Sequence, residues 1–280
     1  FRRVLFRSLE YNMKHRGDVY ATHGLGPVAQ ALDIHRGDRM KTLVAMDTKS
    51  VVGKSLVEER TGQPCENFRN GDHTTTLIRT ENGKVIEIQH DVMTPQPYNR
   101  LYQLTGTKGF ANKYPIEGYA LDAKQLNASG VVPEVDNLNS HSFMPKKDME
   151  ALVQKYQHPI LKKYGEMAKE VGGHGGMDFI MDSRLVYCLQ NGLPLDMDVY
   201  DLAEWCCLAE LGELSMDNNC AAVAFPDFTR GEWNKVKGYK HAYASPEDES
   251  VAMEKAKKIT AKLKEKGAVE WAGEAVENKK

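Results

Sequence analysis

Several common catalytic signatures are missing from the 280 residues of this chain. It contains no G-x-G-x-x-G and no P-loop, so no nucleotide-binding fingerprint lies within these residues. H-E-x-x-H and G-x-S-x-G are missing too, which excludes the commonest zinc-protease and hydrolase signatures. No Asp or Glu stands in the apolar, glycine-flanked setting that would single out a pair of glycosidase carboxylates. Any chemistry must therefore come from other groups.

The chain also has little net charge, few cysteines and no long apolar run. Its formal net charge is -2 at pH 7, so nothing indicates nucleic acid or an anionic membrane as a partner. No apolar run approaches the roughly 20 residues that a membrane helix needs. The five cysteines are odd in number and lack C-x-x-C spacing. We therefore expect buried thiols, with no disulfide framework and no metal site.

The first eight residues do not resemble the start of a natural protein. The chain does not begin with Met, and Phe1 to Ser8 match the translation of a common sequencing-library adapter. We therefore expect residues 1–8 to be an adapter-derived artefact, and the natural protein to continue upstream of Leu9. The compartment stays open, because any export signal would lie in that upstream part.

Hydrophobic patterning predicts an α+β fold whose first half is rich in strands. Asn82-Gly83 is a strong hairpin signal between two runs of strand-forming residues. Ser50 is expected to cap a helix that Gly62 ends. Further strands make an open, mostly antiparallel sheet with one covered face. The expected strands cover residues 40–46, 74–80, 84–92, 100–104 and 109–113.

The second half is expected to be mainly helical, after an irregular polar stretch at residues 122–143. We expect one domain over residues 9–240, then a charged C-terminal helix and tail over 241–280. The predicted helices of the domain cover residues 148–156, 160–170, 174–190 and 198–214.

Candidate chemical groups are His and Tyr residues at the ends of elements. Tyr20 and His23 precede the turn Gly24 to Pro27, and we expect His23 just before a helix N-terminus, where a neutral imidazole is favoured. The pair suits proton transfer, and a capped helix with a core histidine is the alternative. His174 likewise precedes a helix among glycines, either as a functional group or as a cap. Tyr102 and His90 lie on predicted strands, where core packing is the default.

Four motifs, at residues 17–29, 35–39, 106–109 and 172–179, together resemble glycoside hydrolase family 109. This family comprises NAD-dependent α-N-acetylgalactosaminidases of the Gfo/Idh/MocA oxidoreductase superfamily, and the resemblance runs from Leu9 to about Trp233. It implies that the chain is the C-terminal α+β domain, that a Rossmann domain is missing upstream, and that NAD is mostly bound there. It also implies a possible homo-oligomer through the sheet.

The resemblance implies an unusual glycosidase chemistry on terminal α-N-acetylgalactosaminides. NAD takes hydride from C3 of the sugar, the aglycone is eliminated after loss of the C2 proton, water adds, and the ketone is reduced again. Tyr20, Ala21, Thr22 and His23 match the substrate-binding motif, and Tyr20 would also contact NAD. Tyr102 is a further substrate contact. The implied catalytic residues are His23, Tyr20 and His174.

Two departures from the family pattern and two other functions deserve note. Ala21 stands where the family usually has Pro, and Ser8 stands where we expect a sugar-contacting Arg.

The alternatives are an NAD(P)-dependent sugar oxidoreductase of the same superfamily and a non-catalytic sugar-binding or oligomerisation module. We expect the fragment to be inactive alone. Family members are often exported, but localisation stays unknown.

Overall fold

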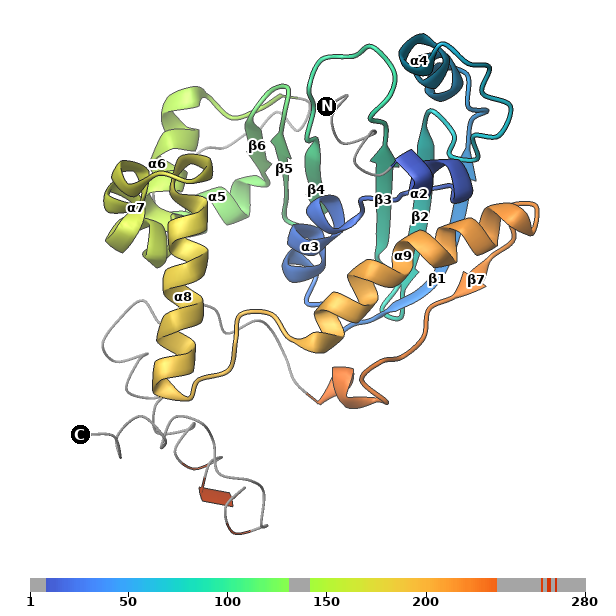
Figure 1. The fold of residues 1–280 in the computed structure, drawn as a ribbon. Coiled ribbons are helices and arrows are strands. Elements are labelled where there is room, and N and C mark those ends of the chain that lie inside the picture. The colour runs from blue at the N-terminus through green and yellow to red at the C-terminus, as the bar shows by residue number, and fades with distance from the viewer. Residues whose placement is uncertain (1–8, 131–141, 236–257, 259–260, 263–264, 266–280) are drawn as a thin grey trace. The chain divides into compact units, whose positions relative to one another are not determined.

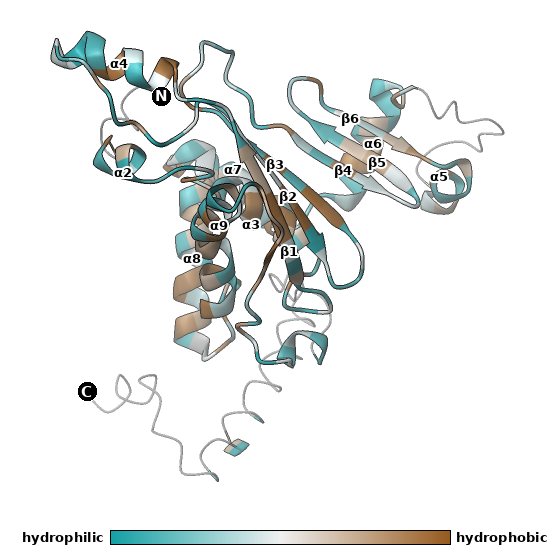
Figure 2. Cartoon of the chain, turned by 90° about the vertical axis from the view of Figure 1, so that its right-hand side faces the viewer, coloured by the Kyte–Doolittle hydropathy of each residue, from teal (hydrophilic) through white to brown (hydrophobic). Residues whose placement is uncertain are grey.

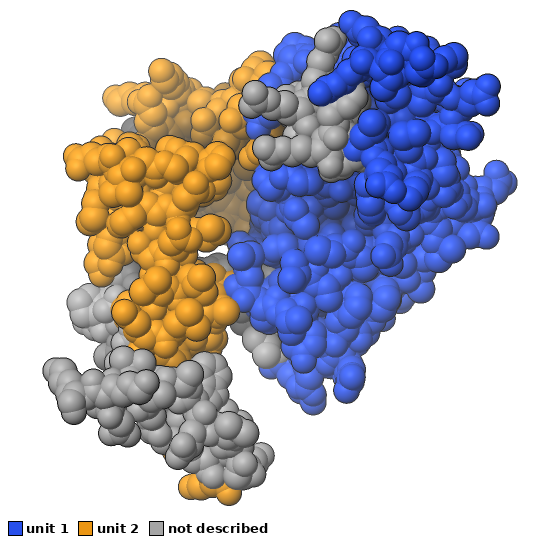
Figure 3. All heavy atoms as spheres, viewed as in Figure 1, with its two compact units in different colours: residues 1–98, 197–239 blue, residues 99–196, 240–280 orange. Residues whose placement is uncertain are grey.

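The computed structural model describes residues 9–130 and 142–235 together with the isolated positions 258, 261–262 and 265. The chain forms two compact units (Figure 3): residues 1–98 and 197–239 make unit 1, and residues 99–196 and 240–280 make unit 2. The chain thus leaves unit 1, builds unit 2 and returns. The expected adapter segment lies outside the described residues, as does nearly all of the expected C-terminal helix and tail.

Unit 1 is built on a four-stranded antiparallel sheet in the order β3-β2-β1-β7. The hairpin predicted at Asn82-Gly83 is confirmed, and Gly83 has φ +81°, which glycine adopts without steric cost. The strands are β1 (Met40–Asp47), β2 (Thr74–Thr80), β3 (Val85–His90) and β7 (Val223–Ala224).

Two helices, α3 (Thr22–Ala31) and α9 (Val199–Asp217), cover one face of this sheet (Figure 1). Figure 2 shows apolar residues where these helices lie against the strands. Leu25 of α3, Leu43 of β1 and Leu208 of α9 are fully buried in this core. Each contributes about 1.5–3 kcal/mol by leaving water. Gly26 brings the two helices close, because a Cβ there would lie 3.3 Å from the Trp205 ring.

A second, smaller core in unit 1 joins α4 (Val52–Thr61) to the loop that follows it. Gly62 ends α4 in the left-handed conformation, as predicted. The predicted cap was wrong. The carboxylate of Asp72 accepts the backbone N–H groups of Val51, Val52 and Gly53 at 2.8–2.9 Å, in place of Ser50. The short α2 (Leu9–Lys14) and η2 (Glu232–Asn234) complete the unit.

Unit 2 contains a three-stranded antiparallel sheet and a group of helices. The irregular stretch expected from residue 122 instead opens with a helix, α5 (Ala123–Ser129), whose N-cap Asp122 accepts the Gln125 N–H. The other elements are β4 (Tyr102–Gly106), β5 (Gly109–Lys113), β6 (Gly118–Leu121), α6 (Lys146–Tyr156), α7 (Pro159–Val171), η1 (His174–Gly176) and α8 (Met177–Asn191). Helices and antiparallel sheets in both units confirm the α+β class.

Candidate functional site

Tyr20 and His23 lie together at the start of α3, as the sequence predicted. Their rings stack with centroids 4.7 Å apart and planes 26° apart, and the Tyr20 hydroxyl lies 3.4 Å from His23 Nε2. Tyr20 is 51% exposed, and His23 is exposed too. The pair therefore presents a phenol and an imidazole to solvent from one turn of chain.

The turn that carries Tyr20 is fixed from below by buried amide groups. Gly17 donates its N–H to the Asn70 side chain at 3.0 Å, and Asn70 donates in turn to Asn12 at 2.7 Å. Gly17 has φ +104°, and a Cβ there would lie 2.7 Å from the end of the Met216 side chain. A larger residue at position 17 would therefore be strained at this φ, and the end of the Met216 side chain would have to move.

The structure corrects the expected start of this helix. His23 was predicted just before the N-terminus, but α3 begins at Thr22 and His23 lies in its first turn. Ala21 is the N-cap, is 6% exposed and belongs to the core, so its side chain anchors the turn. The first-turn position keeps His23 near the positive end of the helix dipole. The substrate-binding roles of Ala21 and Thr22 stay predictions.

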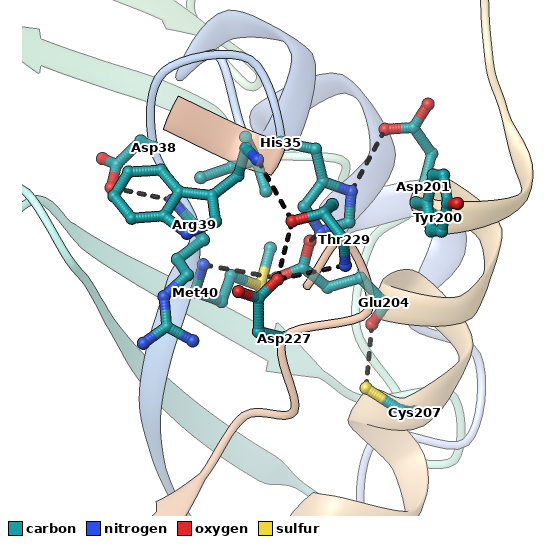
Figure 4. Close-up of polar contacts among 12 residues, drawn as sticks. His35, Asp38, Arg39, Met40, Tyr200, Asp201, Glu204, Cys207, Asp227 and Thr229 are labelled. Carbon is teal, nitrogen blue, oxygen red and sulfur yellow. Dashed lines mark hydrogen bonds and ion pairs between the residues drawn. The ribbon is translucent and has the colours of Figure 1, made fainter. Parts of the chain in front are cut away.

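An ionic network fixes the other end of α3 against α9 (Figure 4). Arg36 donates to both carboxylate oxygens of Asp201, at 2.7 and 2.8 Å, in a bidentate pair. His35 Nε2 contacts the buried Glu204 carboxylate. Asp38 accepts the backbone N–H of Asn82 at 3.0 Å, which ties the same loop to the hairpin. The motif at residues 35–39 therefore sets the position of α3, and with it that of Tyr20 and His23.

A buried charged pair that the sequence did not indicate lies beneath the turn. Asp18 is 2% exposed, and neither of its carboxylate oxygens has a hydrogen bond of normal geometry among the described residues. Burial raises the pKa of Asp18, against the opposing effects of His90 and of the Tyr20 backbone N–H. His90, predicted to be a satisfied core histidine, has a half-buried ring whose Nε2 lacks such a bond within the described part of the chain.

His174 belongs to unit 2, in the glycine-rich corner between α7 and α8. It has φ +46°, a side chain that is 76% exposed, and an Nδ1 atom 2.8 Å from the Asp178 carboxylate in the first turn of α8. A Cβ on Gly176 would lie 2.6 Å from the Ala168 backbone of α7. Gly176 therefore allows α7 and α8 to approach each other closely. The acid/base role of His174 stays a prediction.

Tyr102 is the first residue of β4 in unit 2, where it pairs with Lys113 of β5 and is half-buried. Its predicted contact with substrate is neither supported nor opposed by these neighbours.

The expectation of buried thiols is met by Cys65 and Cys188, whereas Cys206 is exposed and Cys207 and Cys220 are partly buried. Burial raises the pKa of Cys207 to about 12, and its side chain packs against the core cluster. Among the described residues, no group of three or more His, Cys, Asp or Glu side chains could hold a metal ion. In the same part of the chain, no helix has the length and apolar character needed to cross a bilayer.

The chain is an α+β protein with an exposed Tyr-His pair, and comparison with known proteins gives its family. Residues 3–235 match the family described as glycosyl hydrolase 109, C-terminal domain. The chain therefore belongs to glycosyl hydrolase family 109.

Two relatives illustrate the match. Glycosyl hydrolase family 109 protein 5 of Phocaeicola vulgatus is 85% identical over 272 residues, which are 97% of this chain and 52% of that protein. The glycosyl hydrolase family 109 protein of Porphyromonas gingivalis is 62% identical over 236 residues, which are 84% of this chain and 50% of that protein. The chain thus spans about half the length of these curated relatives.

Proposed function

We propose that this chain is the C-terminal half of an NAD-dependent glycosidase that hydrolyses terminal α-N-acetylgalactosaminides. The observation that carries the proposal is the exposed, stacked pair of Tyr20 and His23 on a turn held by the core. The family match and the resemblance of residues 20–23 to a substrate-binding motif support the same reading.

The Tyr20–His23 pair suits contact with both a cofactor and a sugar. The phenol ring of Tyr20 offers an exposed aromatic face, on which a flat nicotinamide ring can stack. When bound, NAD accepts hydride from C3 of the sugar and later returns it, so that the reaction has no net redox change. The upstream half, with its expected Rossmann domain, would hold most of the cofactor.

The chain's own contribution is the handling of protons and hydroxyl groups. The His23 imidazole accepts a proton from the sugar and returns it, while the Tyr20 hydroxyl, 3.4 Å from Nε2, orients the imidazole. We assign substrate contacts to Ala21 and Thr22 on the resemblance alone. We assign Tyr102 as a further substrate contact and His174 as a second acid/base group on the resemblance alone.

The test is a kinetic comparison of two histidine variants in the full-length gene product. With an aryl α-N-acetylgalactosaminide as substrate, His23→Gln is expected to lower kcat/KM by roughly 10²–10⁴-fold, the contribution of a general acid/base group. His158→Gln is the matched control, since His158 is a helix cap in unit 2 whose side chain accepts the Ile160 N–H. Normal turnover by His23→Gln would contradict the role of His23.

Further measurements on the same full-length gene product distinguish glycosidase activity from the two alternative functions. Accumulation of NADH with free sugars, without glycoside cleavage, would identify a sugar oxidoreductase. An upstream reading frame without a dinucleotide-binding motif would instead support a non-catalytic sugar-binding or oligomerisation module. Cleavage of the glycoside that stops when NAD is removed and resumes when it is restored is the result we expect.

A further inference from the structure

Asp18 and His90 are ionisable residues that act on each other electrostatically, and Asp18 lies in the turn that carries Tyr20. Asp18 precedes Tyr20 by two residues, in the turn whose Gly17 is bonded to Asn70. His90 is the last residue of β3. Two residues earlier on the same face of β3, Ile88 lies 3.9 Å from where a Cβ on Gly24 would stand. The start of α3 therefore lies over the face of β3 that also carries His90.

The buried polar atoms of this cluster lower the stability of the folded state. Both Asp18 oxygens, His90 Nε2 and the Thr74 hydroxyl are buried, without a hydrogen bond of normal geometry among the described residues. Thr74 stands opposite His90 in the β2–β3 register, so its side chain shares the same face. Buried polar groups are normally bonded, and an unbonded carboxylate is particularly unfavourable. Asn has nearly the same shape as Asp and would not place a charge there.

The two groups act on each other and on the turn above them. The charge of Asp18 raises the pKa of His90, although burial dominates and leaves that pKa lowered. The backbone N–H of Tyr20 lies near enough to Asp18 to act on the carboxylate. Asp18 is thus connected to Tyr20 through the backbone, and Tyr20 is connected to His23 through its hydroxyl.

We propose that Asp18 and His90 are positioning residues for Tyr20 and His23: they hold the turn between Gly17 and Ala21 and place a negative charge beneath a pair that takes up and returns a proton. This inference rests on the proposed function. Asp18 makes no contact with substrate in this arrangement, because it is buried, and it acts only through Tyr20 and His23.

The first test uses NMR on the chain as it stands and needs no activity. In Asp18→Asn, His90 is expected to titrate at lower pH than in the parent, and the ring resonances of His23 and Tyr20 are expected to move. Asp122→Asn in unit 2 is the matched control, because Asn caps a helix as well as Asp does. Unchanged His90 titration, or unchanged His23 and Tyr20 resonances, in Asp18→Asn would overturn the proposal.

The second test measures glycosidase kinetics and thermal stability of the full-length gene product. Asp18→Asn is expected to lower kcat roughly 10–100-fold, the effect of a small misplacement of catalytic groups, with KM nearly unchanged and no loss of Tm. His90→Gln, which keeps an N–H group, is expected to retain more activity than His90→Leu. A fall in kcat that follows a fall in Tm would mean a merely structural role and would overturn the proposal.

The two tests separate this inference from the proposed function. If the folded full-length parent does not cleave the glycoside, the proposed function fails, while the NMR comparison still decides whether Asp18 and His90 position the turn. If the parent cleaves it and Asp18→Asn behaves like the parent in both tests, only the positioning role fails.

Discussion

Single residues explain why one half of the site could be predicted and the other could not. Tyr20 and His23 are three residues apart, so a helical turn brings them together, and their pairing follows from local sequence. Asp18 and His90 meet only because β3 returns beneath α3. The sequence shows Asp18 only as a single carboxylate between Gly17 and Val19. No local pattern indicates that His90 would be its partner.

The burial of Asp18 has a measurable consequence for stability against pH. Its pKa is raised in the fold, so it stabilises the folded state only while protonated: this contribution is complete below the ordinary Asp pKa of about 3.9 and is lost as pH rises through the raised value. Asn at this position does not ionise. We therefore expect the unfolding free energy of Asp18→Asn to increase relative to the parent as pH rises from about 4 to 7, as measured by urea denaturation.

The contribution of His90 to stability depends on pH in the opposite direction to that of Asp18. Burial lowers its pKa, so its contribution is complete above the ordinary His pKa of about 6.5 and is lost as pH falls below it. His90→Gln is thus the companion measurement. The charged groups on the neighbouring elements are His73 and Asp91 beside His90, and Arg16, Asp47, Glu213 and Asp217 around Gly17. A constant stability difference between Asp18→Asn and the parent over this pH range would contradict the expected burial effect.

At the level of elements, predictions succeeded where the signal was local. The hairpin at Asn82-Gly83 and the helix end at Gly62 depend on adjacent residues, and both are confirmed. The cap of α4 comes from Asp72, in a loop beyond the helix. Ser50 was predicted instead because it lies next to the start of the helix. Helix α5 was missed because its polar, turn-forming residues resemble a loop, although Asp122 is a good cap.

The cap of α4 gives a prediction for one element. Asp72→Ala removes the acceptor of three backbone N–H groups, so we expect a loss of about 2 kcal/mol of stability, the upper range for one cap. Asp72→Asn keeps one acceptor oxygen and is expected to lose less. Urea denaturation and hydrogen exchange of the Val52 and Gly53 amides measure the effect.

Ser50 provides the control for this prediction. Its hydroxyl is buried and makes no hydrogen bond to the described residues, so Ser50→Ala is expected to leave the stability unchanged or to raise it. If Ser50→Ala cost more than Asp72→Ala, the cap assigned by the sequence would be right and the contacts of Asp72 would be unimportant.

For the whole molecule, the division into two units predicts where a protease cuts first. The boundary between Tyr98 and Asn99 lies in the exposed segment 95–101, which has no helix or strand. Proteases prefer such segments to packed elements. We expect trypsin to cleave after Arg100 before it cleaves after Arg36 or Arg184, whose side chains are buried in ion pairs. Intact-mass measurements over a time course detect the fragments.

A single substitution checks the site of cleavage. Arg100→Gln is expected to delay the appearance of the two corresponding fragments without a change in Tm, since the side chain is exposed. Earlier cleavage after Lys41 within β1 would mean that unit 1 opens more readily than the boundary segment does. That result would contradict the division into compact units.

The return of the chain to unit 1 has a consequence during synthesis. Strands β1, β2 and β3 emerge from the ribosome early, but Trp205 and Leu208, which cover their apolar face, follow only after all of residues 99–196. A chain elongates at about 5–20 residues per second, so the uncovered face persists for many seconds. The part of the sheet that α9 covers therefore stays open while residues 99–196 are made, and only α3, which precedes the strands, can pack on that face in the meantime.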